Sequence, residues 1–115
     1  MNEESFRKEQ DLITCVVQRG KADKVAKAAL DAGAGGATVF FGRGMGLRER
    51  LGLLGLAIVP EKEIILIVSE KTDTLRIFNA VIEAGKLDVP GMGIAYVSTI
   101  QAVVGLVPSG KDKKE

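Results

Sequence analysis

The sequence repeats itself once, and this internal repeat limits the possible folds more than any other feature. When the first half is shifted by 52 positions, apolar residues fall on apolar residues and a glycine falls on a glycine. Two strand–helix–glycine–strand units with matching apolar faces are typical of a doubled βαβ arrangement. We therefore predict an α+β, ferredoxin-like sandwich with a four-stranded antiparallel sheet and a short C-terminal strand. The matched pairs are Leu12 with Ile64, Val25 with Ile77, Ala26 with Phe78, Ala29 with Val81, Leu30 with Ile82, and Gly33 with Gly85.

The first unit contains a strand, a helix and a glycine stop. Leu12–Val17 is short and rich in β-branched residues, which predicts a buried strand. Between Lys21 and Ala32 the apolar residues recur at helical spacing, so this segment is predicted to be an amphipathic helix. Gly33 stands where a left-handed residue would end that helix. A second strand is predicted at Ala37–Phe41.

The second unit repeats this order with differences at its start. Leu54–Val59 and Glu63–Val68 have strand composition, and the proline of Pro60–Lys62 predicts a break between them. Ser69 is a candidate N-cap for a helix that ends at Gly85. The packing face of that helix is predicted to carry Leu75, Phe78, Val81 and Ile82. Further strands are expected at Ile94–Val97 and within Ile100–Val107.

The length of 115 residues fits one domain. We assign residues 1–10 to a flexible N-terminal segment, 11–107 to the folded domain, and 108–115 to a disordered tail. Sixteen basic and fifteen acidic residues leave a net charge of +1, so no strong field favours nucleic acid as a partner. The polar N-terminus does not resemble a signal peptide, and the apolar run Leu51–Val59 is shorter than the ~20 residues that span a bilayer.

The cysteine and histidine content argues against most catalytic and metal sites. Cys15 is the only cysteine, it lies in an apolar run, and the chain has no histidine. A structural zinc site and a Ser-His or Cys-His triad are therefore excluded. No intramolecular disulfide can form, which fits a reducing compartment. We expect a cytoplasmic protein that is not an enzyme and that holds no metal.

Two glycine loops are the candidate ligand sites. In Gly42–Gly46 every second residue is glycine, and Arg43, Arg48 and Arg50 flank the exposed main-chain N–H groups, as in an anion cradle. A soluble surface loop is an equal alternative from this pattern alone. The second loop, Gly85–Gly93, carries Lys86 and is longer than a simple connector needs to be.

Exposed apolar residues point to association with other protein chains. The sheet face away from the helices would carry apolar side chains, which predicts self-association. The loop leucines Leu51, Leu53 and Leu54 are interpreted as a partner-binding surface, since such side chains seldom stay exposed without a partner.

An acylphosphatase-type enzyme is a third possibility on the same topology. Gln18-Arg19-Gly20-Lys21 occupies the place of that family's arginine loop, but its surroundings do not follow the family pattern. Asn79, in the second predicted helix, is not placed as a catalytic asparagine, so we rank this hypothesis low.

Over roughly residues 12 to 107 the chain resembles the P-II nitrogen-regulator family. The resemblance is carried by Thr38-Val39 leading to Gly44-Met45-Gly46, by Val59-Pro60, and by Ala84-Gly85-Lys86. It implies a homotrimer of ferredoxin-like subunits that binds ATP, ADP or AMP in the clefts between subunits. It also implies a role in nitrogen regulation and signal transduction, in which a mobile loop docks on a regulated protein such as a membrane transporter.

The resemblance also assigns site residues. Thr38 matches the position near the adenine, and Gly44, Met45 and Gly46 match the base of the mobile loop. Gly85 and Lys86 match the loop that closes the second helix, and Arg48 is added as an anion ligand. The family's basic residues of the last strand correspond to Gly105 and Val107 here. The alternative is therefore a trimeric interaction scaffold of the same fold that binds no nucleotide, similar to the divalent-ion-tolerance trimers.

Overall fold

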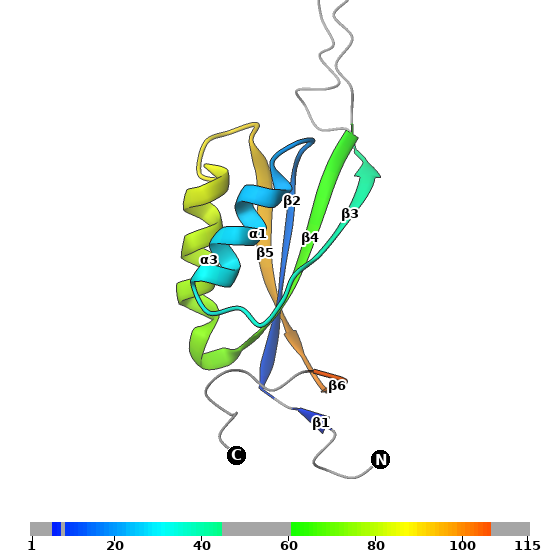
Figure 1. Ribbon diagram of the computed structural model, residues 1–115, viewed down its shortest axis with the longest axis vertical. Coiled ribbons are helices and arrows are strands. Elements are labelled where there is room, and N and C mark those ends of the chain that lie inside the picture. The colour runs from blue at the N-terminus through cyan, green and yellow to red at the C-terminus, as the bar shows by residue number, and fades with distance from the viewer. Residues whose placement is uncertain (1–5, 8, 45–60, 107–115) are drawn as a thin grey trace, which may run out of the picture.

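The computed structural model describes residues 6–7, 9–44 and 61–106, and it confirms the predicted ferredoxin-like sandwich (Figure 1). The main sheet has the strand order β3-β4-β2-β5, and every neighbouring pair is antiparallel. Both helices cover one face of this sheet (Figure 1). The elements are β1 (Phe6–Arg7), β2 (Gln10–Gln18), α1 (Ala22–Asp31), β3 (Thr38–Arg43), β4 (Glu61–Glu70), α3 (Lys71–Gly85), β5 (Gly93–Ile100) and β6 (Val103–Val104).

The core lies between the helices and the sheet, and it follows the internal repeat. Ile13 and Ile65, 52 positions apart, are both completely buried on the helix side of the sheet. Val25 on α1 and Ile77 on α3, at the same separation, are also completely buried. Burying a side chain of this kind contributes about 1.5–3 kcal/mol, so these matched positions hold the two halves together. The buried apolar residues are Ile13, Cys15, Val17, Ala22, Val25, Ala29, Ile65, Ile67, Ile77 and Val81.

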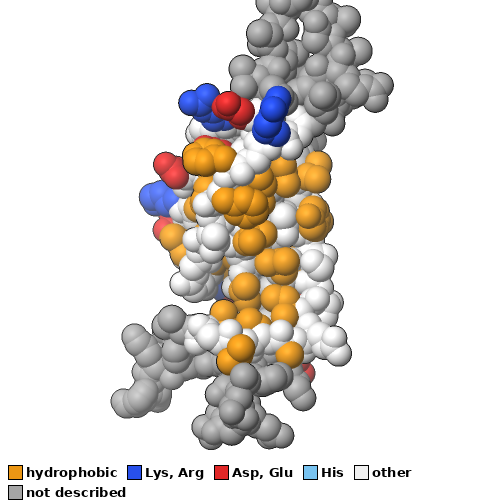
Figure 2. Space-filling view, turned by 90° about the vertical axis from the view of Figure 1, so that its right-hand side faces the viewer, with side chains coloured by type: hydrophobic (Ala, Val, Ile, Leu, Met, Phe, Trp, Pro, Cys, Tyr) orange, Lys and Arg blue, Asp and Glu red, His pale blue; other side chains and the backbone are white. Residues whose placement is uncertain are grey.

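The other face of the sheet is apolar and has no cover among the described residues. Side chains alternate along each strand, so the pair Val16–Ile64 faces away from the helices while the pair Cys15–Ile65 faces them. Seen from the sheet side, hydrophobic side chains run down this face (Figure 2). Ile94 and Tyr96 on β5 are about half exposed. The open face consists of Leu12, Val16, Phe40, Ile64, Leu66, Val68, Ile94 and Tyr96.

The start of the second unit differs from the prediction in two ways. β4 already begins at Glu61, which pairs with Arg43, so the predicted break does not include Glu61 or Lys62. Pro60 itself and the predicted strand Leu54–Val59 lie outside the described residues. Ser69 is not the N-cap of α3, because β4 continues alongside β2 and pairs Ser69 with Asp11. The N-cap is Glu70.

The packing face of α3 is rotated relative to the predicted one. Leu75, predicted to pack, is 70% exposed, whereas Ile77 is completely buried. The buried residues Asp73, Ile77, Val81 and Gly85 recur every four positions, and this stripe faces the sheet and α1. The predicted face shares Val81 with this stripe but extends to Leu75 instead of Asp73, because a polar residue gives no apolar signal.

Both ends of the described chain take part in the fold. Within the segment 1–10, which the sequence predicts to be flexible, Phe6–Arg7 forms β1 and Gln10 begins β2. β1 pairs with β6, so the short C-terminal strand that we predicted forms a separate two-stranded sheet. The two strands of this sheet are nearly a hundred residues apart in the chain, so no local sequence pattern indicates that they pair. The tail 108–115 lies outside the described residues.

Candidate functional site

The two predicted glycine loops lie at the same end of the sheet. β3 ends at Arg43, next to Gly44, and the loop from α3 to β5 runs across the same end (Figure 1). β3 and β5 are the outer strands, with β4 and β2 between them, so they lie about 14 Å apart at the usual strand spacing. Gly44 and Lys86 of one subunit therefore do not line a common cleft.

The loop between α3 and β5 is ordered by its own hydrogen bonds. Lys86 adopts the left-handed conformation (φ 54°, ψ 44°), and the Leu87 N–H donates to the carbonyl of Ile82 at 2.9 Å. The side chain of Lys86 is exposed at this turn. Gly85, by contrast, is buried in the last helical turn, where an added Cβ would lie 3.1 Å from Leu87. Lys86 can thus meet a ligand directly, while Gly85 allows close packing beneath it.

The end of β3 carries positive charge beside an exposed ring. Phe41 is 73% exposed, and Arg43 is exposed on the same strand. The Arg19 guanidinium lies 2.8 Å from the carboxylate of Glu61. These side chains surround a hollow of about 430 Å³ at the last residues of β3. The remaining predicted residues, Met45, Gly46 and Arg48, and the loop leucines Leu51, Leu53 and Leu54, lie outside the described residues.

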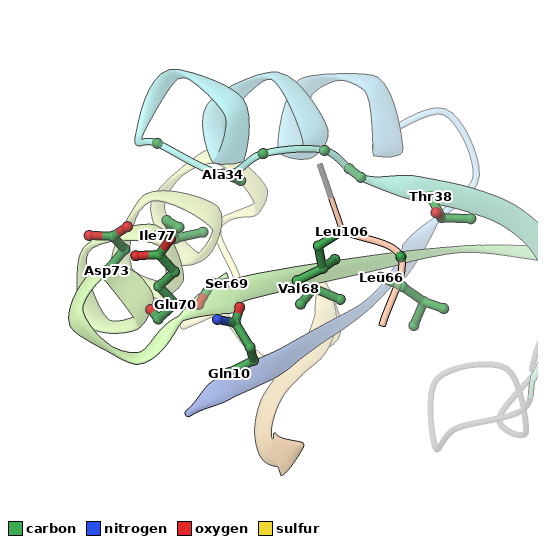
Figure 3. Close-up of a pocket in the computed structure, with 15 residues that line it drawn as sticks. Gln10, Ala34, Thr38, Leu66, Val68, Ser69, Glu70, Asp73, Ile77 and Leu106 are labelled. Carbon is green, nitrogen blue, oxygen red and sulfur yellow. Dashed lines mark hydrogen bonds between the residues drawn. The ribbon is translucent and has the colours of Figure 1, made fainter. Parts of the chain in front are cut away.

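Thr38 lies at the opposite end of β3, about 17 Å from Arg43 along the strand. It lines a second cavity of about 380 Å³ under the linker from α1 to β3 (Figure 3). The cavity exists because β3 pairs with β4 only up to Leu66, which leaves the last residues of β4 without a partner on this edge. Its lining comprises Gln10, residues 33–38, Leu66, residues 68–70, Asp73, Ile77, Gly105 and Leu106.

A buried polar cluster lies next to this cavity and shares Ser69 with its lining. The carboxylate of Asp11 accepts hydrogen bonds from Lys71 Nζ and Thr74 Oγ1, both at 2.7 Å, and Ser69 Oγ contacts Thr74 Oγ1. The hydrogen bond from Lys71, and with it that from Thr74, holds the pKa of Asp11 below its ordinary value, against an opposing effect of burial. The cluster ties the start of β2 to the first turn of α3.

Three acidic side chains near these sites have structural partners. Glu63 Oε1 accepts the backbone N–H of Ala22 at 2.8 Å and so caps the first turn of α1. Glu61 pairs with Arg19, and Asp73 pairs with Arg76 at 3.1 Å. Each of these carboxylates is therefore committed to a contact within the fold.

Neither a reactive thiol nor a metal cluster is present in the described part of the chain. Cys15 is completely buried between the sheet and the helices, and loss of solvation raises the pKa of its thiol to about 11. A thiol with this pKa is a poor nucleophile at neutral pH. Among residues 6–7, 9–44 and 61–106, no group of three or more Cys, Asp or Glu side chains is arranged to hold a metal ion. Nor do these ranges include a helix with the length and apolar character needed to cross a membrane.

Comparison with known proteins identifies the fold. No protein-family model and no curated protein sequence matches the chain. Among solved structures, the chain is similar to Arabidopsis thaliana PII bound to citrate, with a TM-score of 0.61 and 22% sequence identity. The similarity covers 82% of this chain and 79% of that one. The chain has the PII fold. The predicted resemblance is confirmed at the level of fold.

The structure does not bring all of the predicted site residues together. Thr38 begins β3, Gly44 follows its end and Lys86 follows α3, so Thr38 lies at the other end of the sheet from Gly44 and Lys86. Gln10 was missed, because it belongs to a segment that reads as a charged and aperiodic N-terminus. Its position directly before Asp11 and the β-branched run is the sequence feature that could have placed Gln10 in the first strand of the sheet.

Proposed function

We propose that this protein is a PII-like signalling protein that senses a small anionic ligand between its subunits. Three copies would pack through the open sheet face, and an adenine nucleotide would bind in each cleft. The observation that carries the proposal is that Gly44 and Lys86 stand at the same end of the sheet, Gly44 directly after the outer strand β3 and Lys86 in the loop that leads to the other outer strand, β5. Each can meet its counterpart only on a neighbouring copy.

The charges at this end favour an anion. Lys86 and Arg43 are exposed, and Arg19, which pairs with Glu61, lies in the turn after β2 near Arg43. Charge-assisted hydrogen bonds from such groups are about twice as strong as neutral ones. The solved PII protein of the same fold is bound to citrate, which is also a small anion. In our proposal, ligand binding changes the loop after Gly44, whose residues Leu51, Leu53 and Leu54 contact a regulated protein such as a membrane transporter in the cytoplasm.

The apolar sheet face supports the trimer. Ile94 is 58% exposed, Tyr96 48% and Phe40 45% in the single subunit. An apolar surface of this extent on a small protein marks an interface. We expect native mass spectrometry to give three times the subunit mass of 12.2 kDa. A monomer at micromolar concentration would contradict the inter-subunit site.

Ligand binding is tested by isothermal titration calorimetry of the full chain with ATP, ADP, AMP and citrate. The variant Lys86→Ala should weaken anion binding about tenfold, because it removes one charge-assisted contact. The control is Lys27→Ala, an exposed lysine in the middle of α1 that pairs with Asp31. Equal loss in both variants would place the ligand elsewhere, and no binding up to millimolar concentration would remove the sensing role.

The second candidate function is a trimeric scaffold that binds no nucleotide. It is favoured by the chemistry of the cavity below Thr38, whose lining includes Glu70 and Asp73 but no lysine or arginine. A trimer that fails to bind any of the four ligands, yet retains a protein partner, would support this alternative.

A further inference from the structure

One glutamine side chain links the loop from α3 to β5 with the strand on the other side of β2. Gln18 is the last residue of β2, which runs between β4 and β5 and ends where this loop crosses the sheet (Figure 1). Its Nε2 donates a hydrogen bond to the carbonyl oxygen of Gly91 in the loop, at 3.3 Å. Its Oε1 accepts a hydrogen bond from Nζ of Lys62 on β4, also at 3.3 Å.

The contact with Lys62 extends this link to Gly44. A Cβ added at Gly44 would lie 3.7 Å from Cγ and 3.8 Å from Cε of Lys62, so the aliphatic part of the lysine runs beside this glycine. Lys62 is the residue directly opposite Gln18 in the sheet. This pair lies two positions along the strands from the pair Val16–Ile64, so both side chains lie on the open face. A line of contacts therefore crosses the end of the sheet from Gly44 to the loop.

The two hydrogen bonds of Gln18 need a side chain that donates and accepts at the same time, as a carboxamide does. A glutamate in this place would accept from Lys62 but could not donate to Gly91, and a leucine would make neither bond. The backbone hydrogen bonds of Leu87, Val89 and Met92 run within the loop or back to α3. The bond from Gln18 instead ties the loop to the sheet.

We propose that Gln18 is a positioning residue that couples Gly44 to the loop that carries Lys86. An anion bound beside Gly44 attracts the ammonium group of Lys62 and competes for it with the neutral oxygen of Gln18. Hydrogen bonds in a chain polarise one another, so loss of the bond from Lys62 weakens the bond to Gly91 and loosens the loop. This inference rests on the proposed function, since the anion and the role of Lys86 are proposed there.

The link itself is tested in the full chain without ligand, by amide NMR. The reporter is the N–H of Met92, which belongs to the same peptide group as the carbonyl of Gly91. Lys62→Met removes the ammonium group and keeps the aliphatic part. We expect it to shift the Met92 signal in the wild-type background and to leave that signal in place in Gln18→Leu. Lys27→Met, at an exposed lysine on α1, is the control and should shift it in neither background.

The effect on binding is tested by calorimetry with ATP. Gln18→Leu should weaken binding about fivefold, which corresponds to the loss of one hydrogen bond. In the Lys86→Ala background the same change should weaken binding by less than about twofold, because Gln18 acts through the loop that carries Lys86. A general structural defect would instead cause the same loss in both backgrounds. The matched control Gln101→Leu, at an exposed glutamine between β5 and β6, should leave the affinity unchanged.

The outcomes separate this inference from the proposed function. If ATP does not bind but the Met92 shift depends on Gln18, the link stands and the anion site is wrong. If ATP binds and Gln18→Leu weakens binding equally in both backgrounds, the positioning role of Gln18 is wrong while the sensing function stands. A Met92 shift of the same size with and without Gln18 would also overturn the coupling.

Discussion

The two halves of this molecule use their glycines in opposite ways. In the connection between α1 and β3, a Cβ added at Gly35 or Gly36 would meet nothing within 4 Å. In the connection between α3 and β5, a Cβ at Gly93 would lie 2.4 Å from the carbonyl oxygen of Val16, and one at Gly85 would press on Leu87. Gly35 and Gly36 therefore leave open space beneath the linker from α1 to β3. Gly85 and Gly93 instead allow the loop from α3 to β5 to pack closely on its neighbours. The two helix-to-strand connections of the repeat therefore differ, since one leaves a cavity open and the other is closely packed.

The two halves resemble each other in one contact. In each half, a carboxylate on the first strand binds the first turn of the helix of the other half. Asp11 on β2 holds the first turn of α3, and Glu63 on β4 caps the first turn of α1. These carboxylates are 52 positions apart, so the repeat preserves a reciprocal tie between each strand and the helix of the other half. The Asp11 side chain is only 10% exposed and contacts two partners, whereas Glu63 makes a single cap contact. The contact between Asp11 and α3 is therefore expected to contribute more to the free energy of unfolding than the contact between Glu63 and α1.

The contrast between Gly93 and Gly36 predicts the largest change in the free energy of unfolding. Gly93→Ala should lower the free energy of unfolding by on the order of 3 kcal/mol, because φ is +143° and the new Cβ meets backbone rather than a movable side chain. Gly36→Ala should change it by less than about 0.5 kcal/mol. Urea denaturation of both variants measures the difference. Equal losses at the two positions would mean that the first connection is also packed.

The carboxylate comparison predicts an intermediate effect. Asp11→Ala should cost about 2 kcal/mol, because Lys71 and Thr74 lose a largely buried partner, with a discount for the 44% exposure of the Lys71 side chain. Glu63→Ala should cost about 1 kcal/mol, as does the loss of a helix cap. Urea denaturation at pH 7 tests the order, and a larger loss for Glu63→Ala would reverse the comparison.

The contribution of Asp11 should also depend on pH in a definite direction. Its pKa is lower in the folded protein than its ordinary value of 3.8, so its contribution is complete above that value and is lost as the pH falls through the folded-state pKa. The difference between wild type and Asp11→Ala should therefore shrink over the acidic interval below about pH 4. A difference that stays constant over this interval would show that the carboxylate charge is not what stabilises α3.

The smallest effect is expected at Leu75, whose counterpart in the first half is the exposed Asp23. Leu75→Lys should change the free energy of unfolding by less than about 0.5 kcal/mol, because the side chain is 70% exposed in the subunit. The control is Ile77→Ala, which should cost about 2–4 kcal/mol at a completely buried position. Thermal unfolding of both variants checks the orientation of α3, and a large loss at Leu75 would indicate a contact beyond the single subunit.

The sequence alone was sufficient for the fold class, the helix and strand order and most of the core. Hydrophobic periodicity depends only on residues close together in the sequence, so it can be recognised without the structure. The 52-residue repeat shows the same periodic pattern twice, as at Val25 and Ile77. Gly33 was also correctly predicted as the residue after α1, and its φ of +115° is one that glycine adopts without strain. Only the tertiary structure decided the burial of Gln10, the reciprocal contacts of Asp11 and Glu63, and the separation of Thr38 from Gly44. These depend on contacts between residues far apart in the chain, and a polar residue gives no periodic signal of the partner that it will meet.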